Sequence, residues 1–191
     1  MKKEKVSATK KEDRTLSSAK SGDIIDLILA DHKPLKKLIK VMKDMDLSEN
    51  ERREAFDQFA PLLIAHAKPE EEILYSVMKG DAEIRVEAYE GEVEHELAEM
   101  MLQEAKAATD TDVWSAKVKV LAEIVEHHIL EEEDDLLPDY RKSSDKQERL
   151  ELGQKFLDAK ERYENWDFDD MDERFSPSRK IAKKLEPAEH R

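Results

Sequence analysis

Residues 66–76 read HAKPEEEILYS and residues 128–138 read HILEEEDDLLP, and the two stretches align without a gap, 62 positions apart. In each stretch a histidine is followed four residues later by a glutamate, as His66 by Glu70 and His128 by Glu132. Residues four apart lie on one face of an α-helix, about 6 Å from each other. Each stretch therefore predicts a helix that presents an imidazole beside a carboxylate.

The repeat extends to a second pair of histidines, His32 and His95, which are 63 positions apart. Each of the four histidines falls at the middle of a separate apolar stripe of helical period. The stripes run over residues 25–42, 56–77, 84–102 and 113–136. The chain thus reads as two helical hairpins, each with a histidine on its first helix and a His-x-x-x-Glu pair on its second. The predicted fold is all-α, an up-down-up-down four-helix bundle with an extra C-terminal helix and disordered tails.

Local residues set the predicted helix boundaries. Capping boxes are predicted where Ser48 precedes Glu51 and where Ser144 precedes Gln147. We expect the second helix to stop at residues 79–81 and the fourth to end at Pro138. These boundaries divide the chain into a basic tail over residues 1–22, a bundle over 23–140, and a C-terminal helix with a flexible tail over 141–191.

Composition limits the classes of function. The 191 residues carry a net charge of −14, while the two terminal segments are basic, so the bundle itself is strongly acidic. Such a surface repels nucleic acid and anionic membranes, and we expect neither as a partner. The chain has no cysteine, which excludes disulfides and thiolate metal sites. It has no membrane-length apolar segment and no signal-peptide pattern, so the expected location is the cytoplasm.

The two glutamates of the repeat need a cationic partner. Glu70 and Glu132 lie on apolar stripes, where a lone ionised carboxylate costs several kcal/mol. Metal ions supply the missing charge, and imidazole with carboxylate but no thiolate favours iron, manganese or zinc. Four imidazoles and two carboxylates exceed the needs of one ion, whereas two ions bridged by both carboxylates use them all. Most of the neighbouring acids, such as Glu72 and Asp134, are predicted to face water.

This set of residues resembles the hemerythrin-like HHE cation-binding domain over about residues 23–140. The resemblance lies in the helix order, the histidine spacing, the acid pairs after His66 and His128, and the following Leu74-Tyr75 and 136–138. It implies a non-haem di-iron centre, oxo- or hydroxo-bridged, inside a four-helix bundle. By this resemblance, His32 and His66 would bind one iron, His95 and His128 would bind the other, and Glu70 and Glu132 would bridge them.

The chain departs from the oxygen-carrying members of that family at one position. Those proteins have a further histidine one turn after the third-helix ligand, and Glu99 stands there in this sequence. Glu99 is a candidate metal ligand, with a base beside the ligands or a solvated acid as the alternatives. Gly91, one turn before His95, is a candidate for leaving room for a small ligand.

The loss of that imidazole makes reversible oxygen transport a poor expectation. The sequence instead favours a di-iron module that binds or senses oxygen, nitric oxide or peroxide, or that handles iron. The alternative is a redox enzyme that decomposes peroxide or delivers iron for the repair of iron–sulfur clusters. The helix that follows Ser144 would either cover a face of the bundle or mediate contact with a protein partner or a second copy.

Overall fold

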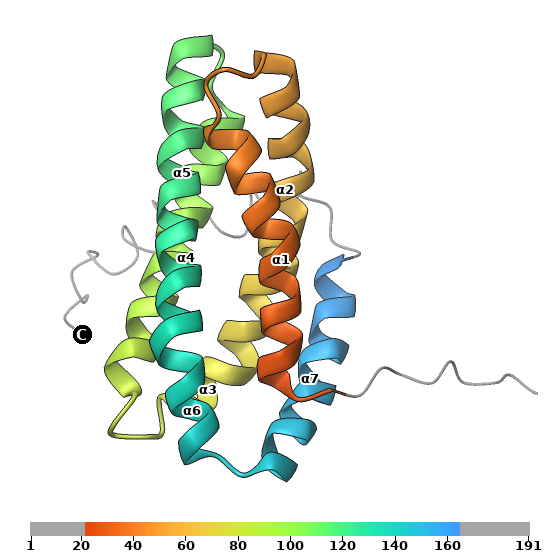
Figure 1. Cartoon of the computed structure of the whole chain (residues 1–191), viewed down its shortest axis with the longest axis vertical. Helices are drawn as coiled ribbons and strands as arrows, with labels where there is room; N and C mark the ends of the chain where they lie inside the picture. The colour runs from red at the N-terminus through yellow and green to blue at the C-terminus, as the bar shows by residue number, and fades with distance from the viewer. Residues whose placement is uncertain (1–21, 165–191) are drawn as a thin grey trace, which may run out of the picture.

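The computed structural model describes residues 22–164, and these form helices without any strand. Four long helices lie side by side: α1 (Ile24–Lys43), α2 (Glu49–Glu70), α4 (Arg85–Lys106) and α5 (Thr111–Glu131) (Figure 1). Their short connections make successive helices antiparallel. The predicted all-α bundle with an additional C-terminal helix is therefore confirmed.

Both second helices of the hairpins are interrupted at positions of the repeat that agree to within one residue. Helix α2 passes into a π-helical turn, η1 (Glu71–Tyr75), and then α3 (Ser76–Met78); α5 passes into η2 (Glu132–Leu136) and then α6 (Leu137–Ser143). The predicted end of the fourth helix at Pro138 was wrong, because the helix continues to Ser143. Pro138 is tolerated because the π turn starts a new segment, in which the first residues need no backbone donor.

Helix α7 (Lys146–Glu164) packs against α1 and α2 (Figure 1). The Asp145 side chain accepts a hydrogen bond from the backbone nitrogen of Gln147 at 2.7 Å, so Asp145 caps the helix. The predicted capping box at Ser144 was wrong, because the Ser144 hydroxyl donates to the carbonyl of Tyr140 instead. The capping box formed by Ser48 and Glu51 is confirmed at the start of α2.

Helix α7 approaches the beginning of α1 very closely. A methyl group at Gly153 would overlap the carbonyl oxygen of Gly22, so only glycine fits at this crossing. The apolar face of α7, which includes Leu152 and Phe156, is buried within the chain. Of the two roles predicted for this helix, the structure shows that it covers the bundle.

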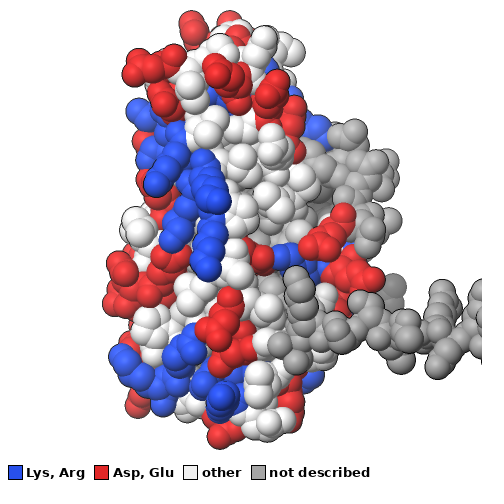
Figure 2. Space-filling model, turned by 45° about the vertical axis from the view of Figure 1, so that its right-hand side comes forward, with Lys and Arg blue, Asp and Glu red and all other residues white. Residues whose placement is uncertain are grey.

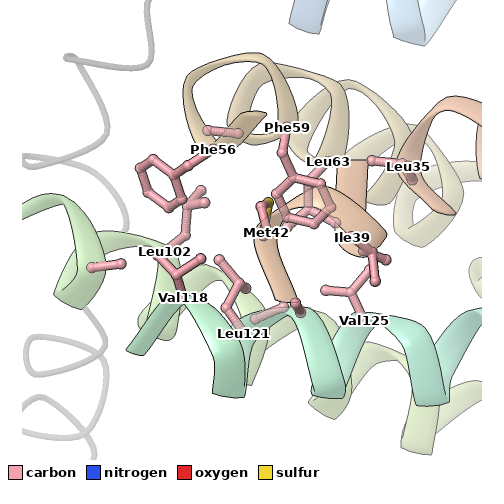
Figure 3. Packing of buried hydrophobic residues seen from close by; sticks show 14 of the residues in the cluster. Leu35, Ile39, Met42, Phe56, Phe59, Leu63, Leu102, Val118, Leu121 and Val125 are labelled. Atoms are coloured by element: carbon pink, nitrogen blue, oxygen red, sulfur yellow. The ribbon is translucent and has the colours of Figure 1, made fainter. Parts of the chain in front are cut away.

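The apolar core forms two clusters, one toward each end of the bundle. One cluster packs Leu35 and Ile39 of α1 against Phe59 of α2 and Val118 and Leu121 of α5 (Figure 3). The other cluster joins the start of α1 to η1, α4, α6 and α7. Along α1 and α4, and along α2 and α5 with the segments that continue them, the histidine lies between residues of the first cluster and residues of the second. The four histidines therefore form a polar layer enclosed by apolar packing above and below.

The surface of the bundle is densely charged. Acidic and basic side chains gather in separate patches on the face seen in Figure 2, with a run of basic residues beside an uncharged area. Within residues 22–164, none of the helices has the length and apolar character needed to cross a membrane.

Candidate metal centre

The four histidines of the repeat meet at the middle of the bundle. His32, His66, His95 and His128 come from α1, α2, α4 and α5, and each is at most 3% exposed. The ring centroids of His32 and His66 lie 5.0 Å apart, and those of His95 and His128 lie 4.4 Å apart. The rings of His66 and His95, which belong to different pairs, are 6.1 Å apart. The side chains thus form two pairs.

Each of the two buried glutamates contacts one histidine from each pair. The Oε2 atom of Glu70 lies 3.4 Å from His66 Nε2 and 3.9 Å from His95 Nε2. The Oε2 atom of Glu132 lies 3.2 Å from His32 Nε2 and 3.4 Å from His128 Nε2. Both carboxylates therefore span the two histidine pairs.

These inward atoms have no hydrogen-bond partners. The Nε2 atoms of all four histidines, both oxygens of Glu70 and Oε2 of Glu132 are buried and unpartnered. Buried polar atoms in proteins are nearly always satisfied, so a cluster of orphans needs an explanation. Two groups of ligand atoms each fit within 4.8 Å, one formed by His66, Glu70, His95 and His128 and the other by His32, His66 and Glu132. Imidazole nitrogen and carboxylate oxygen are ligands of iron, manganese and zinc, so these residues fit a metal ion.

The two glutamates differ in their electrostatic surroundings. Burial and the nearby charge of Glu132 raise the pKa of Glu70 well above its usual range. Burial also acts to raise the pKa of Glu132, but the imidazoles of His128 and His32 outweigh it and hold this pKa well below the usual range. Burial lowers the pKa of His66 well below that of a free imidazole. Of these two glutamates, Glu70 is therefore the one that ionises less readily in the metal-free protein.

An outer carboxylate faces the Nδ1 atom of every histidine. The distances are 3.1 Å from Glu133 to His32, 3.9 Å from Asp31 to His66, 3.2 Å from Glu71 to His95, and 2.8 Å from Glu94 to His128. A carboxylate at Nδ1 favours the tautomer that keeps its proton there and turns a basic Nε2 toward a metal. The arrangement is that of a histidine metal site with its supporting shell.

The outer carboxylates follow the repeat, although sequence reasoning assigned them no role. Asp31 and Glu94 directly precede the first-helix histidines, while Glu71 and Glu133 directly follow the inward glutamates. Glu71 and Glu133 reach across to the opposite hairpin. Lysines balance three of these acids: Lys36 contacts Glu133, Lys68 contacts Glu71, and Lys160 contacts Asp31. The sequence signal that could have identified them is an acid directly before His32 and His95 and a second acid directly after Glu70 and Glu132.

Glu99 is buried but lies outside both groups of ligand atoms. Its carboxylate forms an ion pair with Lys68, which also contacts the outer carboxylate of Glu71. The structure therefore brings six of the seven predicted site residues together and places Glu99 beside a lysine. A role for Glu99 as a ligand stays a prediction.

Tyr75 is a member of the site that sequence reasoning did not single out. Its hydroxyl donates a hydrogen bond to Oε1 of Glu132 at 2.6 Å, and its ring stacks on His95 with the centroids 5.6 Å apart. A methyl group at Gly91 would come within 2.6 Å of the Tyr75 oxygen. The space left by Gly91 is therefore partly filled by Tyr75. Leu137 occupies the equivalent position of the repeat, so only one of the hairpins supplies a hydroxyl here.

A small pocket leads from the surface between α4 and α5 to the histidine layer. Its volume is about 120 Å³, and its inner end is formed by His128 and Glu132. The remaining lining residues are Glu87, Glu90, Gly91, Glu94, Glu131, Asp135 and Leu136.

Among the residues of the predicted acidic runs, Glu72 and Asp134 are exposed, as expected. Residues 1–21 and 165–191, which include most of the two predicted tails, lie outside the described residues.

Residues 23–140 match the family model described as the hemerythrin HHE cation binding domain. The match covers all four long helices, both π-helical turns and each of the inward histidines and glutamates. No curated protein and no solved structure is significantly similar to the chain.

Proposed function

Because the chain belongs to the hemerythrin HHE cation-binding family, we propose that it binds two iron ions in the histidine layer and uses them to bind or sense a small ligand. The observation that carries this proposal is a set of buried ligand atoms without hydrogen-bond partners, namely four histidine Nε2 atoms, both oxygens of Glu70 and Oε2 of Glu132. His32 and His66 would hold one ion, and His95 and His128 would hold the other.

The positions of the two glutamates support two ions rather than one. Glu70 and Glu132 each contact one histidine from each pair, which is the placement required of a bridging carboxylate. A ligand set of imidazole and carboxylate with no thiolate suits iron. When bound, iron would supply reversible one-electron chemistry and a place for a small ligand.

The pocket supports a ligand of only a few atoms. A volume of about 120 Å³ holds a few water-sized molecules but no sizeable organic substrate. Oxygen, nitric oxide and peroxide fit this limit. The lining is formed mostly by carboxylates, which also suits the passage of metal cations.

We expect the protein, loaded anaerobically with Fe²⁺, to retain close to two irons per chain. Metal analysis after gel filtration measures this ratio, and absorption in the near ultraviolet should develop when air is admitted. Exposing the reduced protein separately to oxygen, nitric oxide and peroxide identifies the ligand from its spectrum. Retention of a single zinc ion, with no uptake of iron under reducing conditions, would contradict the proposal.

Tyr75 favours a second candidate, a redox enzyme that decomposes peroxide. Its hydroxyl holds a proton on Oη and donates it toward Glu132 at the inner end of the pocket. A buried proton donor at this place suits a reaction in which oxygen atoms acquire protons. Peroxide consumption over many turnovers would support the enzyme, whereas a single stoichiometric reaction would support the binding or sensing role.

Tyr75→Phe tests the contribution of this hydroxyl. We expect unchanged iron content, an altered spectrum, and a reaction with peroxide that is slower by roughly tenfold, the worth of one hydrogen bond to a charged group. Tyr140→Phe is the matched control, since Tyr140 of α6 is also buried but its hydroxyl forms no hydrogen bond with a site residue that the structure describes. Equal rates for wild type and Tyr75→Phe would show that Tyr75 only packs.

A further inference from the structure

The two halves of the repeat differ at the outer edge of the metal centre. Asp31, the outer carboxylate of the first hairpin, forms an ion pair with Lys160 of α7. Its counterpart Glu94 contacts His128 through one oxygen and lies near His127 through the other. The outer carboxylate on one side of the centre is therefore neutralised by a lysine, while its counterpart on the other side lies near an exposed imidazole and lines the pocket.

A third group of potential metal ligands occupies the open side. Glu94, His127 and Glu131 each offer one atom within 4.8 Å of the others. His127 Nε2 lies 3.2 Å from Glu131 Oε1 and 3.8 Å from Glu94 Oε1. His127 is 64% exposed and Glu131 is 46% exposed, so this group meets solvent directly.

The pocket connects this group to the buried centre. Glu94 and Glu131 line it, and so do His128 and Glu132 at its inner end. His128 and Glu132 are at most 3% exposed, and their Nε2 and Oε2 atoms have no hydrogen-bond partner. The only charged side chains in the lining are acidic, apart from the imidazole of His128. A cation that enters is thus attracted along the whole path and finds unsatisfied ligand atoms at its end.

We propose that Glu94, His127 and Glu131 form a capture site for a divalent metal ion, and that metal reaches the buried centre through the pocket behind it. The inference rests on the proposed metal centre. Two carboxylates and one imidazole suit Fe²⁺ or Mn²⁺, and the exposure of two of the three residues suits weak, exchangeable binding. Glu94 links the two sites directly, because its second oxygen bonds to the ligand His128.

The first hairpin has no equivalent of this site. The repeat places Ala65 and Pro69 at the positions of His127 and Glu131, and neither side chain can bind a metal. Two of the three ligand residues are thus particular to α5. The ligands of the buried centre occur in both hairpins, whereas His127 and Glu131 occur in only one. This difference is expected if His127 and Glu131 deliver the metal and do not bind it in the final site.

The test compares loading rates in the full-length protein. In the double variant His127→Ala, Glu131→Gln, we expect anaerobic uptake of Fe²⁺ by the apo protein to be slower by roughly tenfold, while the final iron content is unchanged. Stopped-flow absorption measures the rate, and metal analysis measures the content. Glu123→Gln is the control, because it removes one exposed negative charge from the same helix, away from the pocket.

A second measurement detects the capture site directly. Electron paramagnetic resonance of Mn²⁺ added to the iron-loaded protein should show one weaker site per chain, which is lost in the double variant and kept in Glu123→Gln. Uptake at the wild-type rate in the double variant would overturn the capture site and leave the di-iron proposal standing. Equal slowing in Glu123→Gln would overturn it as well, since surface charge in general would explain the rate. Wild-type protein that takes up no metal would overturn both proposals.

Discussion

Glu70→Gln is expected to abolish iron binding and, in the metal-free protein, to increase the free energy of unfolding. The two effects have opposite signs because Glu70 has opposite roles in the two states. With metal it is a proposed bridging ligand, whereas without metal it is a completely buried carboxyl group whose two oxygens have no hydrogen-bond partner.

The gain in the metal-free protein depends on pH. Burial and Glu132 raise the pKa of Glu70 in the folded state well above its usual range. Between the unfolded pKa of about 4.3 and the folded value, unfolding therefore releases a proton, and the wild type is destabilised as pH rises. Glu70→Gln removes this penalty, so its advantage should be present at neutral pH and disappear below about pH 4. We expect the gain at pH 7 to be about 1–3 kcal/mol, because each unit by which the folded pKa exceeds the unfolded pKa costs about 1.4 kcal/mol once the group must ionise.

In the iron-loaded protein the order is reversed. Metal bound only to the folded state stabilises the wild type by about 4 kcal/mol at a free concentration 1,000 times the dissociation constant, and the variant loses this contribution. Thermal unfolding of both forms at pH 7 measures the two effects. Asp134→Asn, an exposed acid near the other inward glutamate, is the control and should stay within about 0.5 kcal/mol in both forms. If Glu70→Gln matched Asp134→Asn in both, Glu70 would have no part in a metal centre.

The inward ligands could be predicted from the sequence because their placement is a local property. A helix of known period fixes which face His66 and Glu70 share, and the apolar stripe fixes that this face is buried. The same reasoning applied to His128 and Glu132, and the repeat related the two hairpins. These four residues meet His32 and His95 at the centre of the bundle.

The rest of the site depends on contacts between hairpins, which helical period does not encode. Glu133 reaches His32 and Glu71 reaches His95 only after the hairpins pack together. A pattern with a period of 3.6 residues does not predict the π-helical turns either, and one of them, η1, carries Tyr75 toward Glu132. Sequence reasoning therefore identified the atoms that face the metal and missed most of those that hold them in place.

Arg149→Met is expected to destabilise the protein by about 3–5 kcal/mol, since it removes the nearest cation from the buried carboxylate of Asp23 and leaves only Arg141, at 4.0 Å. Arg149 of α7 donates to Asp23 at 2.8 Å, and both side chains are less than 10% exposed. Asp23 in turn caps α1 by accepting a hydrogen bond from Ile25. Loss of Arg149 thus weakens the start of the helix that carries His32.

Arg162→Met is the matched control for this change. Arg162 lies on the same helix and pairs with Glu72, but both side chains are exposed, so we expect a cost of at most about 1 kcal/mol. Urea unfolding of the metal-free proteins measures both values. Equal effects of the two substitutions would show that α7 is not anchored through Arg149. A larger effect of Arg149→Met, together with faster amide exchange in α7 and weaker iron retention, would show that α7 stabilises the metal centre. The link between the two is Lys160 of α7, which balances the charge of Asp31 beside His66.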